Sequence, residues 1–147
     1  MDGEKMVKSA NALVETRPRI GETEKLTINL GVIDLGQIDL LVQEGFYSNR
    51  TDLIRTAIRN RLAVHADELK QTVARRTLVL GLRDFTRADL ERVQATGETL
   101  KIRVLGLARI ALDVPAELAR ATIESVEVLG AFHASASVRA ALADRIL

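Results

Sequence analysis

The 147-residue chain has no cysteine, no tryptophan and only two prolines, and aromatic residues make up 3% of it. The absence of cysteine excludes disulfides, thiolate metal ligands and cysteine nucleophiles. Because aromatic rings are so few, aliphatic side chains must form any core, and a hydrophobic fraction of 47% supplies them. No apolar run is long enough to cross a membrane. The N-terminal segment also lacks the apolar region of a signal peptide, so we expect a cytoplasmic protein without membrane contacts.

The sequence offers little that would support catalysis. Its only histidines are His65 and His133, and neither stands at a spacing that provides three convergent metal ligands. Glycine-rich phosphate-binding loops of the G-x-G-x-x-G or G-K-[ST] kind are also missing. We therefore expect no enzyme activity, no metal and no cofactor. The net charge of +1 argues against a nonspecific polycation but leaves room for a local basic surface.

One short segment has the alternation of a strand. Residues 1–23 are polar, of mixed charge, and are predicted to form a flexible arm. The stretch "KLTINLGV", Lys25–Val32, then alternates polar and apolar residues as a strand with one buried face does. A single strand cannot satisfy its own backbone hydrogen bonds, so it requires a partner.

Two helices are predicted after this strand. In the first, Asp34 is the expected N-cap and Gly45 the C-terminal stop. In the second, Asn49 is the expected N-cap, with Asp52 three residues later. An apolar stripe predicts that the second helix runs from Arg50 to about Val73, with a break near His65.

The order of these elements, together with the stretch "GFYSNRTDLIRTAIR", resembles the ribbon-helix-helix family of DNA-binding proteins of the Arc, MetJ and CopG type. The likeness covers about residues 24–64 and is strongest to the nickel-responsive CopG-type repressors. It implies that the strand pairs with the same strand of a second chain above four helices. Gly31-Val32-Ile33 departs from the pattern, because many members have a proline or charged residue there. The two histidines are too few for the nickel ligands, so the likeness does not extend to metal sensing.

Alternation along the strand gives the implied ribbon a polar face made of Lys25, Thr27 and Asn29. These side chains can read base edges in the major groove, where a two-stranded ribbon fits. A solvent-facing strand without ligand would show the same alternation. Phosphate contacts are expected at the start of the second helix, where free amides and the helix dipole attract anions. The expected phosphate-binding residues are Ser48, Asn49, Arg50 and Thr51, and ordinary helix capping is compatible with that role.

Residues 77–147 contain an internal repeat. The triplet V-L-G occurs three times, with glycines at 81, 106 and 130, and a short helical pattern follows each copy. A strand and a helical turn in each unit of about 24 residues is typical of a solenoid. Stacking the copies would place the V-L-G strands in a short parallel sheet, with a bend or a close backbone approach at each glycine. Similar strand-helix units in an ordinary α/β domain would explain the pattern too.

The sequence as a whole predicts an α+β protein with a flexible arm (1–23), a ribbon-helix-helix domain for DNA binding and dimerisation (24–76) and a small α/β repeat domain for oligomerisation or regulation (77–147). The expected function is sequence-specific regulation of transcription, as a repressor. The expected partners are double-stranded DNA and further copies of the chain, as a homodimer or higher homo-oligomer, with a nucleoid-associated location. Two alternatives stay open: the antitoxin of a toxin-antitoxin pair, and a cooperative DNA-coating or segregation protein.

Overall fold

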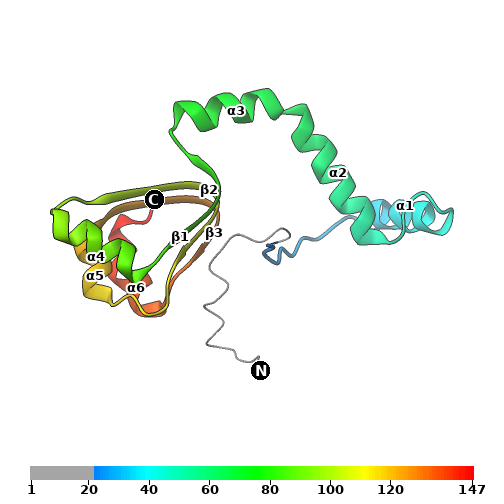
Figure 1. The fold of residues 1–147 in the computed structure, drawn as a ribbon. Coiled ribbons are helices and arrows are strands. Elements are labelled where there is room, and N and C mark those ends of the chain that lie inside the picture. Colours follow the sequence, from blue (N-terminus) through cyan, green and yellow to red (C-terminus); the bar gives the residue numbers. More distant parts are fainter. Residues whose placement is uncertain (1–21) are drawn as a thin grey trace, which may run out of the picture. The chain divides into compact units, whose positions relative to one another are not determined.

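The computed structural model describes residues 22–147, and the predicted arm at 1–23 lies almost entirely outside this range. The chain divides into two compact units. One is Glu24–Ala74, and the other comprises Arg75–Leu147 together with Glu22 and Thr23. Among the described residues, the first unit consists of helices and turns after an extended beginning, and all three strands lie in the second unit, so the architecture is α+β (Figure 1).

The N-terminal unit contains the helices α1 (Val32–Gln43), α2 (Arg50–Val64) and α3 (Ala66–Arg75), of which the last ends at the unit boundary. The expected break at His65 is confirmed, because this residue separates α2 from α3. Asn49 is the N-cap of α2, as predicted, and its side chain accepts the Asp52 amide.

The predicted start of α1 is wrong. Gly31, with extended backbone, is the N-cap, and its carbonyl accepts the Leu35 amide at 3.0 Å. Val32 therefore begins the helix rather than ending the strand. Asp34 lies in the first turn, where a carboxylate favours the positive end of the helix dipole without capping it.

The C-terminal unit is built on the parallel strands β1 (Val79–Phe85), β2 (Leu100–Ile110) and β3 (Ile123–His133), in the order β1-β2-β3. Their register aligns the three V-L-G triplets: Val79 with Val104 and Val128, Leu80 with Leu105 and Leu129, and Gly81 with Gly106 and Gly130. The prediction that the triplets form a short parallel sheet is therefore confirmed.

Each strand of this sheet leads into a short helix: α4 (Arg87–Thr96), α5 (Ala116–Thr122) and α6 (Ala136–Ala141), the last followed by a 3-10 turn, Ala143–Arg145. The strands curve around the three helices, which lie together against one face of the sheet (Figure 1). Thr86 and Asp89 form a reciprocal capping box at the start of α4, and Ser135 caps α6. Three successive strand-helix units thus stack side by side.

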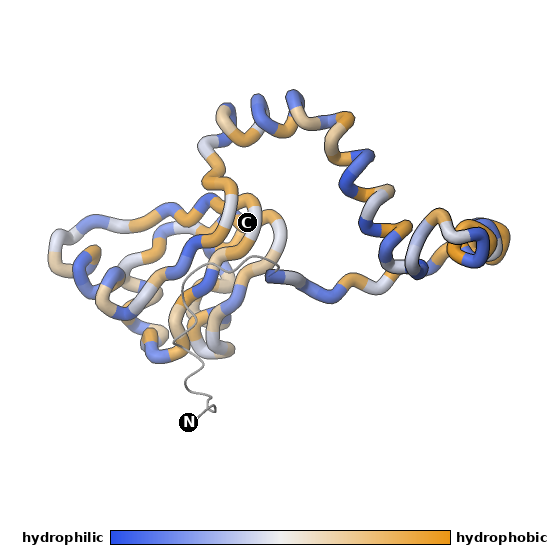
Figure 2. Tube along the Cα trace, turned by 45° about the vertical axis from the view of Figure 1, so that its right-hand side comes forward, coloured by the Kyte–Doolittle hydropathy of each residue, from blue (hydrophilic) through white to orange (hydrophobic). Residues whose placement is uncertain are grey.

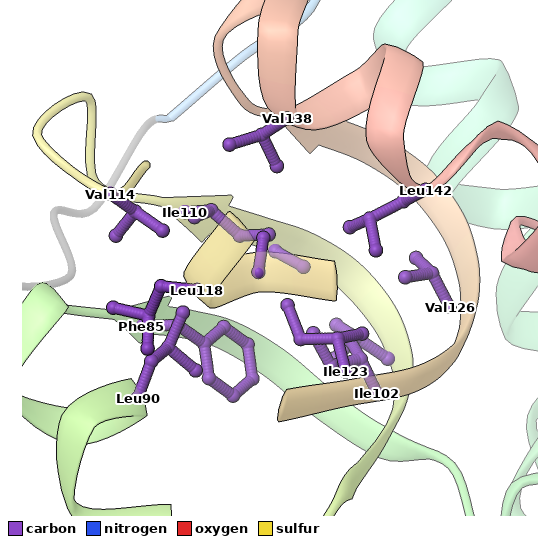
Figure 3. Packing of buried hydrophobic residues seen from close by; sticks show 13 residues of the cluster. Phe85, Leu90, Ile102, Ile110, Val114, Leu118, Ile123, Val126, Val138 and Leu142 are labelled. Carbon is purple, nitrogen blue, oxygen red and sulfur yellow. The ribbon is translucent and has the colours of Figure 1, made fainter. Parts of the chain in front are cut away.

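The core of the C-terminal unit lies between the curved sheet and these helices. Four helix-side residues point toward sheet residues such as Ile110 (Figure 3): Leu90 of α4, Leu118 of α5, Val138 of α6 and Leu142 at the end of α6. Apart from Phe85, the core cluster is aliphatic, as the scarcity of aromatic residues requires. At about 25 cal/mol for each Å² of apolar surface removed from water, such burial dominates the stability of the unit.

The aligned glycines bring neighbouring backbones into close contact. All three have positive φ angles, +124° at Gly81, +140° at Gly106 and +121° at Gly130. A Cβ atom on Gly106 would lie 2.2 Å from the Gly81 carbonyl oxygen, and one on Gly130 would lie 2.1 Å from the Gly106 oxygen. A Cβ on Gly81 would meet no atom within 4 Å. The predicted close backbone approach is therefore confirmed between β1 and β2 at Gly106 and between β2 and β3 at Gly130.

This difference predicts unequal costs for equal substitutions. Gly106→Ala and Gly81→Ala both place a Cβ at a positive φ, but only Gly106→Ala also drives it into a neighbouring carbonyl. We expect Gly106→Ala to lower the free energy of unfolding by about 1–3 kcal/mol more than Gly81→Ala, the usual cost of overpacking. Urea unfolding of dilute protein, followed by circular dichroism, measures both losses. Equal losses would mean that the Gly81 carbonyl moves away from the added Cβ at no cost in free energy.

Candidate nucleic-acid interface

The extended beginning of the N-terminal unit presents two unlike faces. Residues 24–31 form no regular secondary structure within the single chain. Lys25, Thr27 and Asn29 are all exposed. The apolar residues between them are exposed as well, Leu26 by 79% and Ile28 by 55%. Hydrophobic and hydrophilic residues alternate along this segment (Figure 2).

The apolar stripes of the helices are also incompletely covered. Among residues 24–74 none is buried, and Ile58, Leu62 and Leu41 expose between a third and a little over half of their surface. Isolated exposed leucines are normal on proteins. A unit of some fifty residues without a single buried side chain, however, has no core of its own. A single copy of this unit therefore leaves its apolar surface facing water.

The turn into α2 holds the predicted phosphate-binding residues consecutively. Asn49 Oδ1 accepts the Asp52 amide at 2.8 Å, and the Ser48 amide donates to Asp52 Oδ2 at 2.9 Å. Ser48, Asn49, Arg50 and Thr51 are exposed. Replacing such an N-cap with alanine typically costs about 1 kcal/mol. The turn is thus fixed by its own side chains, because Asn49 and Asp52 each accept a backbone amide of the other's end of the turn.

Arg50 forms a bidentate ion pair that the sequence did not predict. Its Nε donates to Asp39 Oδ1 at 2.8 Å and its Nη2 donates to Oδ2 at 2.9 Å, which joins α1 to the start of α2. The hydrogen bond from Arg50 holds the pKa of Asp39 below its usual value, and the same bond raises the pKa of Arg50. Two of the five guanidinium N–H donors are used, so three are left for an anion.

The structure therefore brings Ser48, Asn49, Arg50 and Thr51 together in one turn and places Lys25, Thr27 and Asn29 on a separate segment of the same unit. Asp39 is the residue that sequence reasoning missed. Helical periodicity places Asp39 outside the apolar stripe of α1, but it says nothing about the turn that brings Arg50 back to this carboxylate.

Other kinds of site find little support in the part of the chain that the structure describes. Residues 22–147 contain no group of three or more histidine, aspartate or glutamate side chains that could hold a metal ion. Within the same range, no helix is both long enough and apolar enough to span a bilayer.

Comparison with known proteins agrees with the resemblance seen in the sequence. The ribbon-helix-helix transcriptional regulator family matches residues 21–139, which is most of the chain and extends across both units. No curated protein and no solved structure matches the chain. The chain belongs to the ribbon-helix-helix transcriptional regulator family. Regulators of this family bind DNA and usually dimerise, which makes the chain a DNA-binding regulator of transcription.

The ion pair between α1 and α2 predicts that the stability of the N-terminal unit depends on pH. Because the folded pKa of Asp39 is depressed, its stabilising contribution is present above the unfolded pKa and is lost as the pH falls through the folded pKa. An NMR titration should find the Asp39 carboxyl group titrating below the ordinary aspartate value. Arg50→Ala should return it to that value, whereas Arg61→Ala on the same helix should leave it unchanged. An unchanged titration in the Arg50 variant would show that the pair does not form in solution.

Proposed function

We propose that the chain is a sequence-specific repressor that reads DNA with a β-ribbon made by two copies of residues 25–31. The observation that carries the proposal is the extended segment of the N-terminal unit, which exposes an apolar face and a polar face and has no strand partner among residues 22–147. Pairing with the same segment of a second chain would satisfy its backbone and cover its apolar face.

Dimerisation follows from the uncovered apolar surface. In the proposed ribbon, Leu26, Ile28 and Leu30 of both chains face the helices, and the apolar stripe of α2 completes a shared core. Each fully buried leucine or isoleucine side chain contributes about 1.5–3 kcal/mol relative to exposure. A core of this kind forms only between two chains, which accounts for the lack of any buried residue in one copy of the unit.

DNA contact uses the opposite face. Two-fold symmetry doubles Lys25, Thr27 and Asn29 into six side chains on one ribbon, a size that enters the major groove. Lysine donates to guanine, asparagine pairs bidentately with adenine, and threonine contacts a base edge or a thymine methyl group. At the start of α2, backbone amides of the first turn, the Ser48 and Thr51 hydroxyls and the remaining donors of Arg50 hold a phosphate and so position the ribbon.

We assign residues 77–147 the role of joining dimers, because equal numbers of acidic and basic residues make this region poorly suited to holding DNA. Its three strand-helix units form a short solenoid in this interpretation. A toxin-binding antitoxin tail, by contrast, is usually short and disordered, and Arg75–Leu147 is a compact unit with a buried core.

The dimer is tested by placing the same charge on either face of the segment. Ile28→Asp puts a carboxylate in the proposed shared core and should yield monomer at concentrations at which the unaltered protein is no larger than a dimer. Thr27→Asp, one residue away on the polar face, should leave the dimer intact. Sedimentation velocity at several concentrations distinguishes these states. A dimeric Ile28→Asp protein would show that dimerisation arises elsewhere in the chain.

The reading face is tested by replacing Lys25, Thr27 and Asn29 together with alanine. Each good bidentate contact provides about 1–3 kcal/mol of base discrimination, so specific binding should fall to the nonspecific level while the dimer persists. A site selected from random DNA by the unaltered protein serves as ligand, and fluorescence anisotropy at fixed salt measures affinity. Alanine at the exposed Lys70 and Gln71 of α3 is the matched control. Specific binding that survives the triple substitution would place the reading face elsewhere.

A further inference from the structure

We infer that the C-terminal units of different chains stack head to tail, with β3 of one chain adding to the free edge of β1 of the next in the register that already joins β1, β2 and β3. This inference rests on the proposed joining of dimers and specifies the surfaces that make it. The occupant of the β1 edge is a second copy of this chain.

The first observation is the unoccupied space beside Gly81 at the β1 edge. Gly106 and Gly130 need a glycine because the carbonyl of the preceding glycine lies about where a Cβ would be. Gly81 has the same unusual backbone, at φ +124°, but nothing lies within 4 Å of its Cβ position. A preceding strand with a glycine in register would occupy this space. β3 ends the same sheet at its other edge and carries Gly130 in that register.

The second observation is an uncovered part of the core beside β1. Val104 is 1% exposed between its neighbours, whereas Val79, its register partner on the edge strand, is 41% exposed. A hollow of about 350 Å³ lies there, lined by Thr77, Val79, Arg83 and Phe85 of the β1 end and by Leu100–Val104 of β2. Within the chain, α4 packs on α5 and α5 on α6. By the same repeat, α6 of the preceding copy would lie next to α4 and cover the hollow.

The β3 edge is open to a strand in the required register except for one side-chain hydrogen bond at Phe132. Ile146 forms a parallel bridge with Val126, and the Leu147 amide donates to the Val126 carbonyl at 2.8 Å. β1 of the next copy would pair with residues 128–133 and therefore starts beyond this bridge. At Phe132, the carbonyl accepts Arg139 Nη2 at 2.6 Å. In the assembly, a backbone amide of the added β1 strand would donate to the Phe132 carbonyl in place of Arg139.

Side chains at the two edges complement each other. Extending the register pairs Leu129 of one copy with Leu80 of the next, which prolongs the ladder Leu80, Leu105, Leu129 on the outer face of the sheet. Leu80 is 72% exposed at the β1 edge. In the same register, His133 of one copy lies opposite Asp84 of the next, whose carboxylate already accepts Arg109 Nε of its own chain at 2.8 Å. The contact joins two different surfaces, so it does not close on a pair and instead links successive ribbon dimers into a ring or an open chain.

Cysteine cross-linking of the full-length protein tests the register, since the natural chain contains no cysteine. Leu80→Cys and Leu129→Cys proteins are mixed without DNA and oxidised. Opposed residues of neighbouring strands lie within the Cα separation that a disulfide spans. We expect a covalent dimer in this mixture and its absence in either protein alone. A mixture of Leu80→Cys with Leu112→Cys, a loop residue exposed by 65%, controls for random collision.

A second measurement uses size rather than chemistry. Wild-type protein should form species larger than a dimer as its concentration rises. Leu80→Lys, which puts a charge on the edge strand, should lose them, and Leu112→Lys should keep them. Cross-linking of Leu80→Cys alone or Leu129→Cys alone would overturn the inference in favour of a two-fold contact, and no cross-link would overturn it outright. DNA binding by the dimeric Leu80→Lys protein is assayed separately, so a failure here leaves the ribbon proposal standing.

Discussion

The contact between successive glycine backbones is the constraint on which the C-terminal unit depends. Because the carbonyl of Gly81 occupies the place of a side chain on Gly106, and that of Gly106 the place of one on Gly130, the strands have one close-packed register. That register aligns valine with valine and leucine with leucine across the sheet. It also sets the spacing at which α4, α5 and α6 pack on the inner face, and so the shape of the aliphatic core.

The two units differ in whether they bury their apolar residues within a single chain. The C-terminal unit buries thirteen residues in one cluster of its own, whereas the N-terminal unit buries none within a single chain. A chain built this way separates two tasks. One unit keeps its shape alone, and the other, by the function proposed above, becomes ordered around a core only when two copies meet. Folding of the DNA-binding part is then tied to protein concentration.

Much of this organisation could be predicted from the sequence because it rests on short-range pattern. The repeated V-L-G triplets aligned the strands, and Asn49 with Asp52 located the start of α2. The start of α1 was misread because Gly31 has no side chain to signal a cap, while Val32 and Ile33 are β-branched residues that favour strands. The Arg50–Asp39 pair was beyond reach, since it depends on the path of a turn rather than on periodicity. The hollow beside β1 likewise appears only once the neighbouring strands are in place.

The ion pair between Arg50 and Asp39 bears on how DNA affinity responds to salt. Neutralising backbone phosphates with free cations releases condensed counterions, and the slope of affinity against ionic strength counts them. An arginine that is already paired with a carboxylate of its own chain offers the phosphate hydrogen-bond donors of fixed geometry but almost no net charge. A phosphate held by Arg50 would therefore be recognised mainly by direction and shape, and would contribute little to the ion-release term. In a chain with a net charge of only +1, such neutral recognition, if the proposed phosphate contact forms, would let selectivity rise without a matching rise in adhesion to arbitrary DNA.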